Sequence, residues 1–143
     1  MNRDIGEMED TLTDNENVAL VRRGYEAFNT ADVATLSALI ADDAVQHVPG
    51  SSQIAGDYKG RDAILVDLYA KIAELTGGSV KAELESVTAE GDDKVVAVHR
   101  ARATRGSKQL DGRTTLVFTV KDGTFVDLEE HWEDEAAGDE FWA

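Results

Sequence analysis

The sequence predicts a single α+β domain in which the helices come first and the strands follow. Three segments before residue 77 carry apolar residues at helical spacing, and four segments after it alternate polar and apolar residues. Short turns separate those four segments, so we expect them to form a meandering antiparallel sheet. The chain has 143 residues, 42% of them hydrophobic, which suits one domain with a packed core.

The first helix is predicted to begin at Asp14, whose side chain can cap the free N–H groups of a first turn. The preceding residues, 1–13, carry few apolar side chains and are expected to form a disordered acidic leader. One face of the helix is apolar at helical spacing: Val18, Val21, Tyr25 and Phe28. Gly24 costs helix stability, which indicates that the second helix or a ligand approaches closely there.

Residues 29–49 predict a helix end, a second short helix and a strand. Asn29 can adopt the left-handed conformation that ends a helix, and Asp32 can cap the next one. The apolar residues of that second helix are Val33, Leu36, Leu39 and Ile40. Ala44–Val48 is then predicted to be a strand that stops at Pro49.

The remaining elements are also separated by turn residues. A loop over residues 50–57 precedes a third helix, predicted over Asp62–Leu75 and stopped by Thr76-Gly77-Gly78. Four strands follow, over residues 80–89, 94–105, 108–121 and 124–132. Asp122-Gly123 is a strong hairpin signal between the last two. Residues 135–142 are expected to form a tail helix that docks Phe141 and Trp142 on the body.

The charge and hydropathy of the chain limit the classes of partner that we expect. The formal net charge is −15, so nucleic acid is not expected as a partner, and binding to anionic membranes is disfavoured. No apolar run approaches the roughly 20 residues of a membrane span. The first 14 residues are polar and do not have the pattern of a secretory signal, so we expect a cytoplasmic protein. The chain has no cysteine, which excludes disulfides and thiol chemistry.

Short motifs recur along the chain in a characteristic order and spacing. They are Tyr25-Glu-Ala-Phe-Asn29, Asp32, Ala41-Asp-Asp-Ala44, His47-Val-Pro-Gly50, Tyr58-Lys-Gly-Arg61, Lys121-Asp-Gly123 and Asp139-Glu-Phe-Trp142. On these motifs, most of residues 17–142 resembles the SnoaL-like family of the nuclear transport factor two-like superfamily, which also holds ketosteroid isomerase.

The resemblance implies that residues 14–143 form one SnoaL-like domain with a cystatin-like α+β barrel fold. In that fold, three N-terminal helices wrap a curved mixed or antiparallel sheet into a cone around an apolar cavity. The resemblance also implies a homodimer through the exposed face of the sheet.

The three groups on which ketosteroid isomerase depends are missing in register. The carboxylate base should precede Pro49, where the sequence has Val48, and the tyrosine donor should stand at Gly24, one residue before Tyr25. The buried acid should fall near residues 114–116, which contain no carboxylate. Steroid isomerisation by that mechanism is therefore rejected.

Histidines are the candidate catalytic groups, because imidazole titrates near neutral pH. His47 lies on the first predicted strand and His99 on a middle one. The residues that share the strand face of His99 are small and would leave room beside it: Val95, Ala97, Ala101 and Ala103. A structural role, with both ring nitrogens hydrogen-bonded, is the alternative for each histidine.

The last strand divides its polar residues between two faces. One face carries Asp127, Glu129 and His131, and the other carries Val126, Leu128, Glu130 and Trp132. The second set is more apolar and is favoured for the core, although alternation alone does not decide which face is inward. SnoaL-like cyclases carry their acid–base aspartate on the late strands, so this strand matters to the expected chemistry.

The predicted function is binding of a small, largely apolar organic molecule in an internal cavity. The resemblance implies cofactor-independent acid–base chemistry of the polyketide cyclase, isomerase or hydrolase type. The candidate catalytic residues are His47 and His99. The candidate ligand-binding residues are Tyr25, Gln46, Val48, Tyr58, Arg102, Leu116, Trp132 and Trp142.

Two further expectations concern what the cavity holds and what else it could do. We expect no cofactor and no metal, because the three histidines lie far apart in sequence and no short ligand spacing exists. The alternative function is a non-catalytic ligand-binding or dimerisation module of the same fold, or an accessory subunit of a larger complex.

Overall fold

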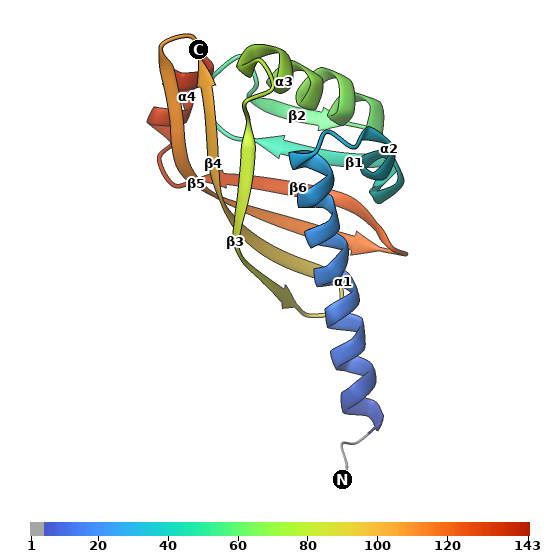
Figure 1. The fold of residues 1–143 in the computed structure, drawn as a ribbon. Helices are drawn as coiled ribbons and strands as arrows, with labels where there is room; N and C mark the ends of the chain where they lie inside the picture. The colour runs from blue at the N-terminus through green and yellow to red at the C-terminus, as the bar shows by residue number, and fades with distance from the viewer. Residues whose placement is uncertain (1–4) are drawn as a thin grey trace.

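The computed structural model describes the backbone of residues 5–143 and the side chains of residues 16–143. Within this part, helices cover one face of a curved sheet (Figure 1). The helices are α1 (Ile5–Asn29), α2 (Val33–Leu39), η1 (Ala63–Ala70), α3 (Lys71–Thr76) and α4 (Glu135–Trp142). The strands are β1 (Ile40–Val48), β2 (Gly56–Lys59), β3 (Lys81–Glu90), β4 (Lys94–Arg105), β5 (Lys108–Lys121) and β6 (Thr124–Trp132). The predicted α+β class is confirmed.

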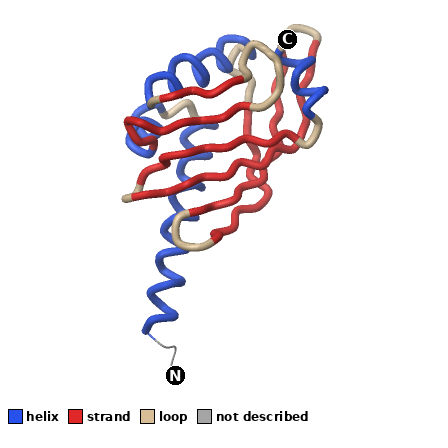
Figure 2. The backbone as a smooth tube through the Cα atoms, turned by 180° about the vertical axis from the view of Figure 1, so that it is seen from behind, coloured by secondary structure: helices blue, strands red, loops and turns tan. Residues whose placement is uncertain are grey.

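The six strands form one mixed, unclosed sheet in the order β2-β1-β6-β5-β4-β3. Strands β3 to β6 are the predicted antiparallel meander, whereas β1 pairs in parallel with β6. Register shifts interrupt three of the pairings, and such irregularities bend and twist a sheet. The sheet therefore has an inner, concave face under the helices and an outer face, which Figure 2 shows from behind.

Helix α1 begins at Ile5, earlier than the predicted cap at Asp14, and so includes residues 5–13 of the predicted leader. The segment contains no proline, the residue that most strongly opposes a helix. Residues 1–4 of that leader lie outside the described residues. No described helix combines the length and apolar character needed to cross a membrane.

The end of α1 corrects the predicted role of Asn29. The residue with positive φ is Ala31, at 56°, and not Asn29. The side chain of Asn29 instead donates to the backbone oxygen of Ala82 and accepts from its N–H, both at 2.8 Å. Asn29 therefore ties the end of α1 to the start of β3.

The region after α1 confirms one prediction and corrects two. The side chain of Asp32 accepts from Thr35 N–H at 3.1 Å, as expected of the cap of α2. Strand β1 begins at Ile40 instead of Ala44, and part of the predicted loop 50–57 forms β2. Strand β1 starts early because Ile40 pairs with Phe125 of β6, which lies far along the sequence. Strand β2 forms by antiparallel pairing with the nearby strand β1.

The third predicted helix is present but irregular. Its first part, η1, has π-helical backbone, and α-helical geometry resumes only at Lys71. Gly77, with φ 60°, ends it at the predicted stop. Later elements match the predicted bounds closely, and Asp122 and Gly123 both have the positive φ of a tight hairpin turn.

Close packing of helices on the inner face explains two of the glycines. A Cβ at Gly24 would lie 3.1 Å from a ring carbon of Phe125, so the close neighbour of α1 there is strand β6, whereas the sequence indicated the second helix or a ligand. The second helix contributes only Leu39, 3.9 Å away. Gly138 of α4 is buried, and a Cβ on it would overlap the ring of Trp132. The docked residues Phe141 and Trp142 are only 3% and 4% exposed.

We expect Gly138→Ala to lower the free energy of unfolding by about 1–3 kcal/mol, because overpacking against Trp132 outweighs the better helix propensity of alanine. Urea denaturation measures this change. Gly112→Ala is the matched control, since a Cβ there meets nothing within 4 Å. Equal stability of the two variants would contradict the tight α4 contact.

Candidate functional site

A cavity of about 280 Å³ lies between the inner face of the sheet and the helices. Residues from α1, α2, η1, α3 and α4 line it together with residues from the strands. Its aromatic lining is Tyr25, Phe28, Tyr69, Phe118, Phe125, Trp132 and Trp142. A largely apolar and aromatic chamber of this size suits a small organic molecule.

Glu130 is the acidic group at the centre of the cavity's polar network. Gln46 Nε2 donates to its Oε1 at 2.9 Å, and Trp132 Nε1 donates to its Oε2 at 2.8 Å. The hydroxyl of Tyr69 in turn donates to Gln46 Oε1 at 2.6 Å. Each carboxylate oxygen is thus held by an uncharged donor, and the donor Gln46 is itself fixed by Tyr69.

Three separate elements bring these residues together. Alternation along β6 puts Leu128, Glu130 and Trp132 on the inner face, as the sequence favoured. Gln46 comes from β1, where it pairs with Leu128. Tyr69 lies in the π-helical part of the third helix, and π-helical segments are often found at functional sites.

Burial determines the protonation of this group. Removal from water raises the pKa of Glu130 above its ordinary value of 4.5, although the hydrogen bonds from Trp132 and Gln46 oppose the shift. Burial likewise raises the pKa of the Tyr69 hydroxyl, which therefore stays protonated. Glu130 is consequently a stronger base than an exposed glutamate when it is ionised, and it accepts a proton more readily.

A second polar pair lies on α1 and β4. The hydroxyl of Tyr25 and Nδ1 of His99 are 2.7 Å apart, and their rings meet edge to face. Burial lowers the pKa of His99 to about 4, so its imidazole is neutral at neutral pH. Burial also raises the pKa of Tyr25. The pair is therefore uncharged.

The structure brings six of the ten predicted site residues to the cavity. They are Tyr25, Gln46, His99, Leu116, Trp132 and Trp142. Val48 and Tyr58 pack beside it, in a hydrophobic cluster that contains Ile54 and Leu68, and the hydroxyl of Tyr58 donates to Ile54 O at 2.8 Å. These two residues support the wall rather than line the chamber.

His47 lies on the outer face of the sheet and not in the cavity. Its Nδ1 is 2.7 Å from Asp57 Oδ1 and its Nε2 is 2.9 Å from Asp127 Oδ1. These bonds link β1 to its neighbours β2 and β6. Because side chains alternate along a strand, Gln46 and His47 cannot share a face, and the parallel pairing with β6 turns Gln46 inward. His47 is therefore placed to hold the sheet edge together.

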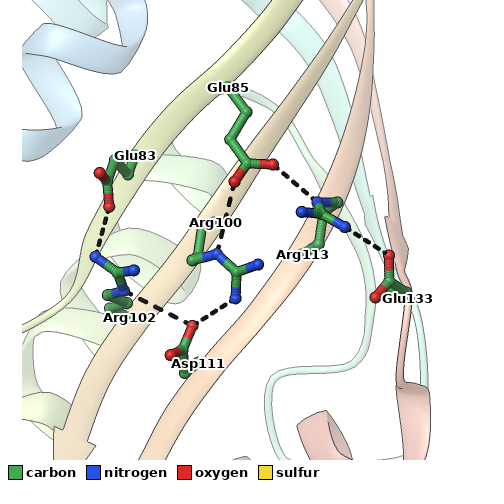
Figure 3. Close-up of polar contacts among 7 residues, drawn as sticks. All are labelled: Glu83, Glu85, Arg100, Arg102, Asp111, Arg113 and Glu133. Atoms are coloured by element: carbon green, nitrogen blue, oxygen red, sulfur yellow. Dashed lines mark hydrogen bonds and ion pairs between the residues drawn. The ribbon is translucent and has the colours of Figure 1, made fainter.

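Arg102 also lies on the outer face, with 55% of its side chain exposed. It belongs to a set of charged residues that bridge β3, β4 and β5 and reach the residue after β6 (Figure 3). The set comprises Glu83, Glu85, Arg100, Arg102, Asp111, Arg113 and Glu133. Arg102 pairs with Glu83 at 2.7 Å, so it is not placed to bind a ligand in the cavity.

Glu130 and Tyr69 were not among the predicted site residues. Alternation along β6 indicated that Glu130 faces inward. The local sequence does not show which of the 29 acidic residues is hydrogen-bonded to Gln46, which lies far away in the sequence. Tyr69 follows the apolar stripe of its helix, which is also typical of core packing. Among the described residues, no group of three or more His, Asp or Glu side chains could hold a metal ion.

Comparison with known proteins agrees with this architecture. Residues 21–128 match the model of the SnoaL-like domain. The chain belongs to the SnoaL-like family. It is 38% identical to the uncharacterised protein Rv0034 of Mycobacterium tuberculosis over 132 residues, which cover 92% of this chain and 100% of that protein. The resemblance inferred from the motifs is thereby confirmed.

Solved structures with the same SnoaL-like fold include Bal32a from a soil-derived mobile gene cassette. It is 44% identical, with a TM-score of 0.89, covering 92% of this chain and 99% of that chain. A Xanthomonas campestris protein with a cystatin-like fold gives a TM-score of 0.82 at 24% identity, covering 88% and 97%. A candidate polyketide cyclase from Sinorhizobium meliloti gives 0.65 at 25% identity, covering 79% and 94%.

The bonds of His47 predict a pH-dependent contribution to stability. Hydrogen bonds to Asp57 and then Asp127 raise the pKa of His47 above 6.5. The protonated imidazole therefore stabilises the fold fully below pH 6.5, and this contribution is lost as the pH rises through the raised pKa. Since these groups are partly exposed, we expect His47→Gln to cost less than about 1 kcal/mol at pH 6, and less still at pH 8.

Denaturation of both proteins across this pH range measures the difference. In an Asp57→Asn, Asp127→Asn background the same substitution should show little dependence on pH, because the two carboxylates are gone. A His47→Gln cost that grows as the pH rises would contradict the assigned role.

Proposed function

We propose that the protein binds a small, largely apolar organic molecule in this cavity and moves a proton on it, with Glu130 as the acid–base group. The observation that carries the proposal is the carboxyl group of Glu130, which lines a largely apolar chamber and is hydrogen-bonded by the neutral side chains of Gln46 and Trp132. A carboxylate with a structural role would more often be paired with a cation.

The arrangement around Glu130 suits proton transfer to and from carbon. A raised pKa brings the carboxyl closer to the pH at which it works, so it can both take up and return a proton. Gln46 and Trp132 fix the orientation of its two oxygens.

The similar solved structures support chemistry of this class. The Sinorhizobium protein with the same fold is a candidate polyketide cyclase, and cyclisation of that type begins with proton removal next to a carbonyl. In this chain, the proposed base lies on β6, the last strand in sequence. The non-catalytic ligand-binding alternative uses the same chamber and differs only in whether Glu130 exchanges a proton with the ligand.

A direct test uses 2-tetralone, a neutral bicyclic ketone with acidic protons beside its carbonyl. We expect the wild type to catalyse exchange of these protons for deuterium in D₂O, measured by NMR. Glu130→Gln should reduce that rate about 100-fold or more, because it removes the base. Glu129→Gln, on the exposed neighbouring residue, is the matched control and should keep the rate.

The same assay has a pH signature. The rate should rise with pH through a pKa above 4.5, because only the ionised carboxyl accepts a proton. Burial keeps Tyr25, Tyr69 and His99, which also line the cavity, neutral near pH 7. Unchanged exchange in Glu130→Gln would overturn the assignment of the base. Binding of 2-tetralone by the wild type without exchange would favour the non-catalytic alternative.

We propose in addition that the chain forms a homodimer through the outer face of the sheet and works in the cytoplasm. Half-buried valines on β4 and β5, Val96, Val98 and Val117, form an apolar patch on that face, beside the charged set of Figure 3. Sedimentation equilibrium should give twice the 15.5 kDa chain mass. Val117→Glu should shift it to the monomer, whereas a monomeric wild type would contradict the proposal.

A further inference from the structure

Tyr25 and His99 form a pair whose hydrogen-bond direction can be worked out from its surroundings. Tyr25 is 7% exposed and His99 is 9% exposed, and their bond joins the tyrosine oxygen to Nδ1 at 2.7 Å. Within the described residues this is the one hydrogen bond that the tyrosine hydroxyl makes. A buried hydroxyl that keeps its proton must donate it, so Tyr25 donates to Nδ1 of His99.

This direction fixes the tautomer of His99. A ring nitrogen that accepts a hydrogen bond carries no proton, and a neutral imidazole has one proton in total. Because burial keeps His99 neutral by lowering its pKa to about 4, its single proton stands on Nε2. His99 is therefore a hydrogen-bond donor on the side of the ring that Tyr25 does not occupy.

That donor has no acceptor within the described part of the protein. His99 lines the cavity, and its Nε2 makes no hydrogen bond to any described residue. No described side-chain nitrogen or oxygen is both fully enclosed and unpaired, so Nε2 keeps accessible surface. The neighbours of His99 on the inner face, Ala97 and Ala101, are small and leave space beside the ring.

We propose that Nε2–H of His99 donates a hydrogen bond to an uncharged carbonyl oxygen of the ligand, and that Tyr25 is the positioning residue that fixes this donor. This proposal rests on the proposed function, because it makes His99 the hydrogen-bond donor that acts with Glu130 on the same ligand. His99 pairs across the sheet with Thr114, which pairs with Trp132, two residues from Glu130. Two strand spacings separate β4 from β6, about 10 Å between the backbones, and both side chains extend into the chamber, so one group can reach a carbonyl oxygen and the other the carbon beside that carbonyl.

The two groups then act on the same proton transfer. Ionised Glu130 takes a proton from the carbon beside the carbonyl, and the electrons of that C–H bond form a C=C bond. The π electrons of the carbonyl move to its oxygen, which becomes negative and accepts a stronger hydrogen bond from Nε2–H. Return of the proton from Glu130 to carbon reverses the step. A carboxylate ligand is disfavoured, because it would bring a second negative charge close to Glu130.

The tautomer is tested without any ligand. In protein labelled with ¹⁵N-histidine, NMR at pH 7 should show His99 as the Nε2–H tautomer, with the signal assigned by its loss in His99→Phe. In Tyr25→Phe this tautomer should no longer be fixed, because Nδ1 has lost its donor. A wild-type His99 that carries its proton on Nδ1 would overturn the proposal.

The ligand contact is tested with 2-tetralone and tetralin, which have the same ring skeleton with and without the carbonyl oxygen. Calorimetric titration of the wild type should show binding of the ketone about threefold to tenfold tighter. His99→Phe should abolish this preference, and His99→Gln, whose amide can donate, should restore part of it. Preference that persists in His99→Phe, or equal wild-type affinities, would overturn the assignment.

Glu130→Gln separates this proposal from the proposed function. That variant should lose deuterium exchange but keep the preference for the ketone, because His99 is intact. Loss of the preference in His99→Phe with no exchange in the wild type would confirm His99 as the donor while rejecting Glu130 as a base. Exchange that depends on Glu130 but not on His99, with no preference for the ketone, would confirm Glu130 as the base while rejecting His99 as the donor.

Discussion

The packing of α1 across the concave face of the sheet is the constraint on which the rest of the structure depends. Gly24 lets the helix approach Phe125, and Asn29 binds the backbone of Ala82 through both atoms of its amide. Tyr25, the residue after Gly24, is therefore held at a fixed height above β4, where its hydroxyl meets His99. The contacts that close the core therefore also position the Tyr25–His99 pair of the cavity.

Burial then sets the charge of the cavity through a single effect. It disfavours ions, so it raises the pKa of Glu130 and lowers that of His99, and it keeps Tyr25 and Tyr69 protonated. All four shifts favour uncharged side chains. In such a chamber the directions of the hydrogen bonds, and not a net charge, orient a ligand. Besides Glu130, the charged residues among the lining, Lys81, Arg113, Asp111 and Asp134, are two cations and two anions, so the charge of −15 is not concentrated at the cavity.

The sequence predicted best what is decided locally. The hairpin at Asp122-Gly123 and the alternation of β4 follow from turn chemistry and strand period, so the inward placement of His99 could be predicted. The four-residue strand β2 pairs with the nearby strand β1 and was missed because it begins among the turn residues of the predicted loop. The early start of β1 depends on pairing with the distant strand β6 and was also missed. His47 was misplaced for the same reason, since its face is chosen by the parallel contact with β6.

The positions of the polar groups show how one fold can change its chemistry. Val48 and Gly24 stand where ketosteroid isomerase would need its base and its tyrosine donor. In this chain the cavity has a carboxyl on β6, at Glu130, and the residue after Gly24 in sequence is Tyr25, whose hydroxyl meets His99 on β4. Because residues from the helices and from five neighbouring strands line one chamber, a polar group can enter it from any of them. The curved sheet therefore conserves the chamber while the source of its reactive groups varies, and a missing motif does not exclude an equivalent arrangement built from other strands.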